Sequence, residues 1–577
     1  MSLSGVCLIK ADYIVEERPP QPILDCVSIN DKHEENTTKP EDTIEPETKK
    51  PRLSKKERRK LHGQNKSRPV FKQDKEKELC NSLINTIAGN ERSTCTKNKC
   101  FFMHDVQEYL NTKPTDIGDQ CYNFITSGFC TRGITCRFGK EHITSDGFNI
   151  INEDKQKERH KTNTVNQLSH DLQNLLKKRN YDFKLAEKIV RYNDLQVKKY
   201  KKTPTTSSSI TDEDIIKTLG REKRSLDWKN KLLLSPLTTV GNLPFRRICK
   251  EFGADITCGE MAMCSSLLQG MPQEWALVKR HHTENVFGVQ LCANNPHLLT
   301  KCGQMLEKEI DVDFVDLNLG CPIELVYREG GGCGLLRRPR VLEACIRSLS
   351  QVLSIPLTVK TRTGVYSTEN IAHDLIPKFG EWGASMVTVH GRSREQRYTK
   401  LADWQYIGRC VESAMPLPVI GNGDILSYED YKTAIDNCPG LTGVMIGRGA
   451  LIKPWIFTEI KEQKLWDISS SERFDIIKKY VNYGLEHWGS DTKGVENTRR
   501  FLLEWLSFLY RYIPVGLLER PPQKINERPP RFHGRDDLET LMASPVASDW
   551  IKISEILLGK VPEGFQFLPK HKSNSYM

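Results

Sequence analysis

The sequence predicts an α/β fold: a (β/α)8 TIM barrel, preceded by two clusters of Cys and His and followed by a C-terminal helical domain. Two observations predict it. From about residue 229, short apolar runs alternate with amphipathic helical stretches, and the alternation occurs eight times over about 230 residues. After residue 466 the apolar runs stop and only helical periodicity continues.

The eight runs have the length and composition of buried parallel strands. In chain order they are KLLLSPL (231–237), ADITCGEM (254–261), NVFGVQLCA (285–293), VDFVDLNLGCP (312–322), LTVKTRTG (357–364), MVTVHGR (386–392), LPVIGNGDI (417–425) and GVMIGRGAL (443–451). Helical segments such as 295–310 and 338–353 separate them. The alternative is an open doubly wound sheet, which usually has a glycine-rich turn after its first strand, and SPLTTVGN matches such a turn poorly.

The chain has 577 residues, of which 38% are hydrophobic and 28% charged, and it suits roughly three or four domains. No apolar run is long enough for a membrane span, and the N-terminus lacks the apolar stretch of a secretory signal. We therefore expect an intracellular protein, cytoplasmic or nuclear or both, with no membrane partner. Eighteen Cys in a reducing compartment favour metal ligation, chemistry or buried packing over disulfides.

Composition divides the chain into five parts. They are a disordered basic tail (1–75), two fingers (76–145), a charged helical segment with a linker (146–228), the barrel (229–465) and the helical domain (466–577). In the tail, KKPRLSKKERRK (49–60) suits a nuclear localisation signal, an RNA-contacting arm or a solvated charge run. TPTTSSSIT (203–211) has the composition of a flexible linker. One helical face is predicted to carry Leu168, Leu172, Leu175 and Leu176.

Two clusters have the residue types of tetrahedral zinc sites. The second and clearer cluster is Cys121, Cys130, Cys136 and His142, spaced x8, x5 and x5, whereas x3 is the common final spacing of a CCCH finger. The first cluster is Cys95, Cys100 and His104, with the distant Cys80 as its fourth ligand. Unmetallated packing cysteines are the alternative for the first cluster. RNA-stacking rings are predicted around the second: Tyr122, Phe124, Phe129 and Phe138, with Arg132, Arg137 and Lys140 for phosphates.

The predicted strands end in polar, titratable or turn-forming residues. In chain order these are Pro236 and Thr238, Glu260, Gln290, Asn318 and Cys321, Lys360 and Arg362, His390 and Arg392, Asn422 and Asp424, and Gly447 and Arg448. The carboxyl ends of barrel strands form the active-site face, so these residues are expected to converge on one site. GNGD (421–424) and GRG (447–449) follow the last two strands, where barrels commonly bind phosphate. Lys360 suits either a Schiff base or a fixed cation near an electron-rich ring.

Two thiols lie close together in NLGCPIELVYREGGGCGLL (318–336). Cys321 directly follows the fourth predicted strand, whereas Cys333 lies further along the loop after three glycines, which favour a mobile or tightly folded segment. The position at the strand end favours Cys321 as the chemical group. Buried packing is expected for the other Cys of the apolar patterns: Cys249, Cys258, Cys264, Cys292, Cys302 and Cys345.

The C-terminal region is predicted to contain a helix after a capping box formed by Ser469 and Glu472, and a second helix over NTRRFLLEWLSFLYRYI. Trp505, Phe508 and Tyr512 lie at helical spacing, which is more typical of a core than of rings that stack on RNA. Contact with RNA or a solvated face is equally compatible with each of Arg499, Arg500, Arg511, Arg528, Arg531 and Arg535.

The motifs resemble those of a known family. SPLTTVGNLPFRR, NLGCP, VKTRTG, VHGRSREQRY, GNGD and IGRG occur in the order found in the FMN-dependent tRNA-dihydrouridine synthases. The two Cys and His clusters, together with NERPPRFHGRDDLETLMASPVASDWIKISE from residue 526, narrow the resemblance to the eukaryotic NAD(P)-linked members that act on position 47 of tRNA. The likeness covers about 80–577.

The resemblance implies a role for each site residue. Pro236, Leu237, Thr238 and Gln290 would line the FMN ring, and Lys360 and His390 would contact the flavin and help hold the uracil. The ribityl phosphate end would lie against Asn422, Gly423, Asp424, Gly447 and Arg448. NADPH or NADH would be the reductant, and Cys321 would protonate C5 of a uridine that becomes 5,6-dihydrouridine.

Several alternatives stay open at this point. One is another FMN or Schiff-base barrel enzyme that acts on a small phosphorylated metabolite, and another is a zinc-finger RNA-binding protein with a non-catalytic barrel. The residues do not decide whether mRNA is a second substrate, which nicotinamide is preferred, or which oligomeric state the protein adopts.

Overall fold

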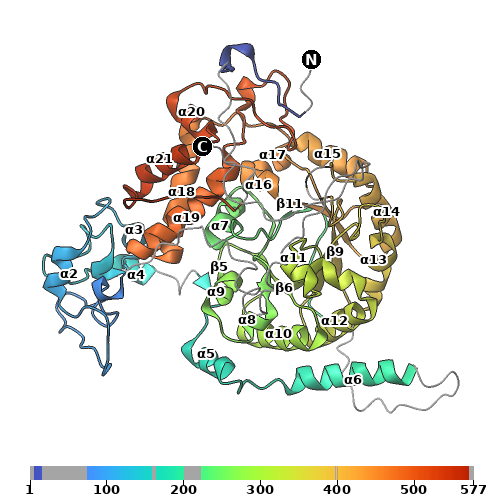
Figure 1. The fold of residues 1–577 in the computed structure, drawn as a ribbon, viewed down its shortest axis with the longest axis horizontal. Coiled ribbons are helices and arrows are strands. Elements are labelled where there is room, and N and C mark those ends of the chain that lie inside the picture. Colours follow the sequence, from blue (N-terminus) through green and yellow to red (C-terminus); the bar gives the residue numbers. More distant parts are fainter. Residues whose placement is uncertain are drawn as a thin grey trace, which may run out of the picture.

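The computed structural model describes residues 5–15, 74–158, 164–200 and 223–570, with the exception of Arg397 and Thr399. Eight parallel strands form a closed barrel with helices around it (Figure 1). They are β2 Lys231–Leu234, β3 Ile256–Cys258, β6 Val286–Cys292, β7 Phe314–Asn318, β8 Leu357–Arg362, β9 Met386–His390, β10 Val419–Asn422 and β11 Gly443–Ile446. The barrel closes because β11 pairs with β2 and β3 pairs with β6. The predicted (β/α)8 fold is therefore confirmed.

Each strand is shorter than the apolar run that predicts it, because the polar end of the run leaves the sheet. The first run reaches Leu237 but β2 ends at Leu234, and the fourth run reaches Pro322 but β7 ends at Asn318. A two-residue strand, β4 Ala262–Met263, extends the sheet beside β6. The predicted site residues consequently lie within the last three positions of the strands or in the loops directly after them.

Apolar side chains fill the amino-terminal half of the barrel interior. They are Trp228, Leu233, Ile256, Cys258, Phe314, Met386, Ile420 and Met445. Gly288 on β6 permits this packing, because a Cβ there would lie 2.1 Å from the Phe314 ring. A filled interior leaves the carboxyl ends of the strands as the open end of the barrel.

Helices cover the outside of the barrel. They are α7 Leu243–Glu251, α8 Cys264–Leu267, α9 Pro272–Trp275, α10 Pro296–Glu309, α11 Glu324–Arg328, α12 Pro339–Val352, α13 Ala372–Glu381, α14 Trp404–Ala414, α15 Tyr428–Asp436, α16 Arg448–Ile452 and α17 Ile456–Glu462. Side chains that cap free backbone N–H groups begin several of them, such as Asn295 before α10 and Ser427 before α15. The two segments predicted as helices correspond to α10 and α12, which both begin with proline at a position that needs no N–H donor.

The C-terminal domain is helical and consists of α18 Ser470–Trp488, α19 Thr492–Leu509, α20 Asp537–Ala543 and α21 Ala547–Leu558. The predicted capping box is confirmed: the Ser469 side chain accepts the N–H of Glu472, and the Glu472 carboxylate accepts the N–H of Ser469. Trp505 and Tyr512 are buried, and Trp505 Nε1 donates to the carbonyl of Leu451 at 3.0 Å. Both rings therefore belong to a core shared with the barrel, as their spacing suggested.

The described N-terminal part contains α2 Val106–Thr112, α3 Tyr122–Ser127, α4 Glu153–Glu158, α5 His170–Lys177 and α6 Lys184–Tyr200, and a short strand β1 Thr164–Val165 that pairs with β5 Arg280–His281. On α5, Leu172 and Leu176 are buried but Leu175 is 44% exposed, so the predicted apolar face is wrong at Leu175. The basic run 49–60 and the linker 203–211 lie outside the described residues. Among the described helices, none is long and apolar enough to cross a membrane.

One part of the N-terminal tail differs from the prediction. Residues 1–75 are expected to be disordered, yet residues 5–15 lie against loops of the C-terminal domain. Cys7 and Ile9 are buried there among Ile513, Leu517 and Phe532. The segment GVCLIKADYIV is mostly apolar, but its composition does not show which loops of the chain it packs against.

Candidate active site and metal clusters

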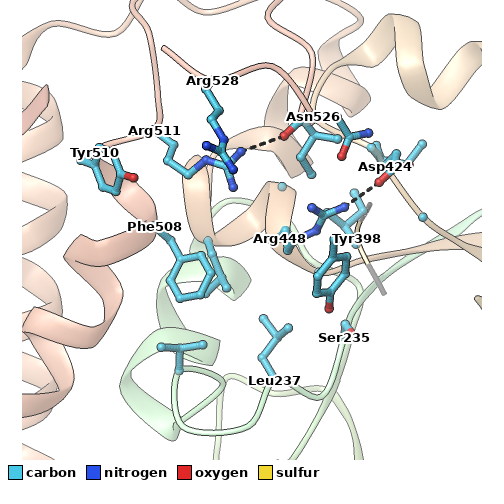
Figure 2. A pocket seen from close by; sticks show the side chains of 18 of the residues that line it. Ser235, Leu237, Tyr398, Asp424, Arg448, Phe508, Tyr510, Arg511, Asn526 and Arg528 are labelled. Atoms are coloured by element: carbon cyan, nitrogen blue, oxygen red, sulfur yellow. Dashed lines mark hydrogen bonds and ion pairs between the residues drawn. The ribbon is translucent and has the colours of Figure 1, made fainter. Parts of the chain in front are cut away.

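A cavity of about 1150 Å³ opens at the carboxyl ends of the barrel strands (Figure 2). One wall consists of the strand ends and the other consists of loops and helix ends of the C-terminal domain. Every flavin-site candidate lines it: Pro236, Leu237, Thr238, Gln290, Lys360, His390, Asn422, Gly423, Asp424, Gly447 and Arg448. Cys321, Asn318, Arg362 and Arg392 line it as well. Glu260 instead lies buried behind the wall and accepts the N–H of Thr239 at 2.5 Å.

A chain of hydrogen bonds below the cavity connects the centre of the barrel to Cys321. The buried Asp316 carboxylate accepts from Thr358 Oγ1 at 2.6 Å and from Gln290 Nε2 at 2.7 Å. Gln290 Oε1 in turn accepts from Asn318 Nδ2 at 2.7 Å. Asn318 Oδ1 accepts the N–H of Cys321 at 2.8 Å. The acceptor-only carboxylate thus fixes which way each amide points, and the last amide holds the backbone of the thiol.

The two thiols differ in their access to the cavity. Cys321 is 8% exposed and lies on the cavity wall, whereas Cys333 is fully buried in the 3-10 turn Gly332–Arg337. The glycines before Cys333 are tightly folded: Gly332 has φ +53°, and a Cβ there would lie 2.9 Å from Cys321 Cβ. Burial raises the pKa of Cys321, so this thiol stays protonated at neutral pH.

Lys360 and His390 lie near the ends of the adjacent strands β8 and β9, and the two side chains carry different charges. Burial, reinforced by Arg362, lowers the pKa of Lys360 to about 8. Burial also lowers the pKa of His390 well below its usual range, so its ring is neutral. Arg392 Nη1 lies 3.3 Å from His390 Nε2, which therefore accepts a hydrogen bond from the guanidinium and leaves the ring proton on Nδ1. Lys360 Nζ has only a 3.5 Å contact with Asn422 Oδ1, so most of its donor capacity faces the cavity.

Asp424 organises the arginines at the end of the site that was predicted to bind phosphate. Its carboxylate accepts from Arg392 Nη2 at 2.7 and 2.5 Å, from Arg448 Nη2 at 2.6 Å and from the N–H of Ala402 at 2.7 Å. The guanidinium carbon of Arg448 also lies 4.1 Å from the ring centre of Tyr398. The carboxylate is fully occupied by cations and an N–H, so its role in this geometry is to orient Arg448 toward the cavity.

The far wall belongs to the C-terminal domain and includes Phe508, Tyr510, Arg511, Asn526 and Arg528 (Figure 2). Of the arginines proposed as RNA contacts, Arg511, Arg528 and Arg531 line the cavity, and Arg500 is exposed outside it. Arg499 contradicts its prediction because it is fully buried and pairs with Glu496, Ser554 and the carbonyl of Leu558. Arg535 is held by Asp467 and Glu539.

The sequence reasoning missed the loop after β9 that places Tyr398 beside Arg448. No apolar pattern identifies this loop, since Tyr398 and Leu401 are 54% and 71% exposed. Tertiary contacts with GNGD and Arg392 fix it: the N–H of Ala402 donates to Asp424, Arg392 Nε donates to the carbonyl of Lys400 at 2.8 Å, and a Cβ at Gly423 would lie 2.3 Å from Ala402 Cβ.

Both predicted Cys and His clusters assemble in the structure. The ligand atoms of each cluster lie within 4.8 Å of one another: Cys80, Cys95, Cys100 and His104 in the first, and Cys121, Cys130, Cys136 and His142 in the second. The Sγ atoms of Cys80 and Cys100 are 3.7 Å apart, as are those of Cys121 and Cys136. Zn–S bonds of about 2.3 Å at a tetrahedral angle require about 3.8 Å.

A buried imidazole adds evidence that the second cluster suits a metal. His142 is fully buried, and its Nε2 has no hydrogen-bond partner among the described residues. The other ring nitrogen, Nδ1, lies 3.2 Å from Asn149 Oδ1. This hydrogen bond fixes the ring orientation, as is usual for a metal-bound imidazole. Three thiols and an imidazole whose Nε2 has no hydrogen-bond partner among the described residues fit tetrahedral Zn²⁺.

The second cluster is packed into the helical domain. Cys130 Sγ lies 3.4 Å from Ser490 Oγ, and the N–H of Arg137 donates to the carbonyl of Ser490 at 2.8 Å. Cys121, Cys130, Cys136 and Phe138 belong to the same core as α18 and α19. Tyr122 contacts Tyr483 edge to face. Phe138 is therefore committed to this interface, which contradicts the prediction that it stacks on RNA, whereas Tyr122 is half-buried there.

Fold and site together define a barrel enzyme: a protonated thiol, a neutral imidazole and a lysine of lowered pKa surround one cavity with an arginine cluster at its end. Residues 233–508 match the family described as Dihydrouridine synthase (Dus). A Xenopus tropicalis protein named "tRNA-dihydrouridine(47) synthase [NAD(P)(+)]-like" is 51% identical over 99% of this chain and 96% of its own length. Proteins of the same name from Homo sapiens and Arabidopsis thaliana are 53% and 42% identical over 90% and 89% of this chain, and 84% and 88% of their own lengths. This chain belongs to the dihydrouridine synthase family.

Lys360 is expected to titrate near pH 8 in the protein freed of its ligands. Its folded pKa of about 8 lies below the ordinary value of about 10.4, so the ammonium form costs stability below pH 8, and this cost disappears as the pH rises toward 10.4. Pulse labelling with acetic anhydride from pH 6 to 10, read by peptide mass spectrometry, should show half-maximal reactivity of Lys360 near pH 8. A Lys360 profile that coincides with that of the exposed lysines contradicts the lowered pKa.

Proposed function

We propose that this protein reduces a uridine of tRNA to 5,6-dihydrouridine, at position 47, with FMN as its flavin and NADPH or NADH as the reductant. One observation carries the proposal: a thiol that stays protonated, Cys321, faces the same cavity as Lys360, His390 and Arg448. Family membership and the names of the relatives support it. The names specify tRNA, position 47 and NAD(P) for those proteins.

The residues present suit FMN. The cavity offers hydrogen-bonding groups for the ring, from Gln290 and Lys360, and the cationic Arg448 for the phosphate. Lys360 retains free donor capacity for a polar ring edge, and Arg448 is held in place for a phosphate by Asp424. When bound, FMN supplies the hydride for the substrate. The protein's own contribution is to hold these groups and to exclude water.

Reduction of the uracil C5–C6 double bond needs a hydride at C6 and a proton at C5. Cys321 holds that proton, because burial raises the pKa of its thiol. Asn318 fixes the backbone of Cys321, and Pro322 directly follows it. Lys360 and the neutral His390 remain available to bind the uracil carbonyls as cationic and neutral donors.

The RNA has to present an unstacked base, because the thiol lies inside the cavity. Apolar side chains and cations border the cavity on both walls: the exposed Ile323, Tyr398 and Leu401 on the barrel side, and Arg511, Arg528 and Arg531 on the helical side. Rings and apolar side chains support a flipped base, and guanidinium groups bind backbone phosphates. The same contacts serve an unpaired uridine in mRNA, which we include as a second substrate.

We further propose that each Cys and His cluster holds one zinc ion. The second zinc stabilises the interface between the finger and the helical domain, because three of its ligands lie in the shared core. The first cluster packs in a separate core formed by Leu79, Val106 and, from the segment of the second cluster, Ile134.

The activity can be tested directly. Purified protein incubated with NADPH and an unmodified tRNA transcript should form dihydrouridine at position 47, mapped by mass spectrometry of ribonuclease fragments, and an mRNA fragment tests the second substrate in parallel. The purified protein should carry a flavin with its visible absorption. A flavin-loaded protein that reduces no uridine contradicts the proposed function, and a colourless protein contradicts the choice of FMN.

Cys321→Ala should nearly abolish uridine reduction while flavin content and tRNA affinity stay unchanged, because only the proton donor is removed. Cys333→Ala serves as the matched control: it removes a thiol from the same loop that is fully buried, and substantial activity should remain. The activity of both variants is measured as single-turnover reduction of tRNA by the prereduced protein. If the two outcomes are reversed, the acid is Cys333.

His142→Ala should release zinc and lower the melting temperature of the helical domain, because the second cluster is part of that domain's core. His104→Ala should release zinc without this loss of stability, because the first cluster has a separate core. Zinc per chain by elemental analysis and melting by calorimetry distinguish the variants. Equal losses of stability would show that both clusters support the fold alike.

A further inference from the structure

Two arginines on the helical wall of the cavity lie close together without a carboxylate between them. Burial lowers the pKa of Arg511, and the nearby charge of Arg528 lowers it further. Within the ranges that the structure describes, neither guanidinium forms an ion pair with Asp or Glu; Arg511 Nη2 donates only to the carbonyl of Ile525, at 3.1 Å. Figure 2 shows both side chains across the cavity from Arg448 and Tyr398. Two unneutralised guanidinium groups at one point are typical of a phosphate subsite.

Among the described residues, the backbone of Arg528 forms no hydrogen bond with its own loop. Pro529 and Pro530 follow it and offer no N–H donors. Both backbone hydrogen bonds of Arg528 are made with residues more than five hundred positions away in the chain: its N–H donates to the carbonyl of Gly5, and its carbonyl accepts the N–H of Cys7, both at 2.9 Å. The position of Arg528 therefore depends on the N-terminal segment.

Residues 5–15, which we call the strap, also form hydrogen bonds with the chain before and after Arg528. The N–H of Lys10 donates to Leu517 and the N–H of Glu519 donates to Leu8, at 3.0 and 3.2 Å. Beyond the prolines, the N–H of Val15 donates to Arg531 at 3.1 Å, and the N–H of His533 donates to Tyr13 at 2.8 Å. The strap thus bridges the loop after α19 and the loop that carries Arg528 and Arg531.

Two buried side chains anchor the strap. Cys7 and Ile9 are 4% and 2% exposed and pack against Leu517, Leu518 and Phe532. Leu8, between them, points outward and is 48% exposed. Val15, at the other end, reaches the cavity wall itself. The alternation of buried and exposed side chains matches an extended segment docked on one face.

We propose that the strap is a positioning element of the substrate site: it holds Arg528 beside Arg511 and so completes a subsite for a backbone phosphate of the RNA. The inference rests on the proposed function for the identity of the ligand. The pyrophosphate of the nicotinamide nucleotide has the same chemistry, and the experiment separates the two sources. Anchoring residues such as Ile9 act through Arg528 and do not touch the substrate.

The test compares Ile9→Asp, which places a charge in the buried anchor, with Leu8→Asp, which places the same charge on the exposed side of the strap. Ile9→Asp should raise the KM for tRNA about ten-fold, since that is the effect of losing one charge-assisted phosphate contact. Its kcat and its rate of NADPH oxidation without RNA should stay at the wild-type level. Leu8→Asp should match the wild type in the KM for tRNA, in kcat and in the rate of NADPH oxidation. Arg528→Ala should show the same rise in the KM for tRNA as Ile9→Asp.

A double variant separates positioning from general stability. Ile9→Asp combined with Arg528→Ala should raise the KM no more than Arg528→Ala alone, because the strap acts through that arginine. Additive effects overturn the proposal, as does an unchanged KM in Ile9→Asp. If NADPH oxidation slows and the KM for tRNA does not change, the subsite serves the nicotinamide nucleotide and the assignment to RNA is overturned.

Docking of the strap can be measured independently of catalysis. Hydrogen exchange at the N–H groups of Cys7, Lys10, Arg528 and His533 should be slow in the wild type and fast in Ile9→Asp. Fast exchange in the wild type contradicts the docking of the strap, even if the enzyme reduces a uridine of tRNA. Slow exchange in a protein that reduces no uridine would instead reject the proposed function and leave the strap's docking intact.

Discussion

Closure of the parallel barrel is the constraint on which the rest of the structure depends. Once β11 pairs with β2 and β3 pairs with β6, all strands end on the same face, and residues from widely separated motifs become neighbours. The interior cannot serve as an alternative site, because Phe314, Met386 and other side chains fill its amino-terminal half. Polar groups that follow each strand are therefore brought to a single opening, and Asp316 connects three of those strands by hydrogen bonds beneath it.

The helical domain converts this open face into an enclosed cavity. It shares a core with the barrel through Trp505, Phe245 and Leu451, and the second cluster of Cys and His extends that core on its other side. Because the finger, the helices and the barrel pack together, the cavity wall is formed by residues from both ends of the chain. The enclosure accounts for the electrostatics of the site: burial is the main cause of the lowered pKa of Lys360 and His390 and of the raised pKa of Cys321.

The sequence was sufficient where local pattern determines structure. Apolar runs located all eight strands, the Ser469 capping box located the start of α18, and ligand spacing located both clusters, including the distant Cys80. The sequence was insufficient where a contact between distant parts of the chain determines the position of a residue. The strap is mostly apolar, but nothing in its sequence names the loops that it contacts. Tyr398 is placed by its contact with Arg448, and Arg499 has the same residue type as the surface arginines but is buried against Glu496. Periodicity reports which face is apolar, but it does not report which element covers that face.

The opposing influences on the pKa of Cys321 explain why a thiol suits the position of the proposed acid. Burial raises its pKa, which keeps the proton in place in the resting cavity. Arg362 and Lys360 act in the opposite direction, because their charges favour the thiolate. The proton is therefore held until a base of sufficient strength forms nearby, and the thiolate that remains is stabilised by two cations already in position. His390 lacks this property, since its pKa lies well below neutral and its ring has no additional proton to release. Lys360 does carry a proton, but its release would remove one of the two cations that stabilise a developing negative charge on the uracil.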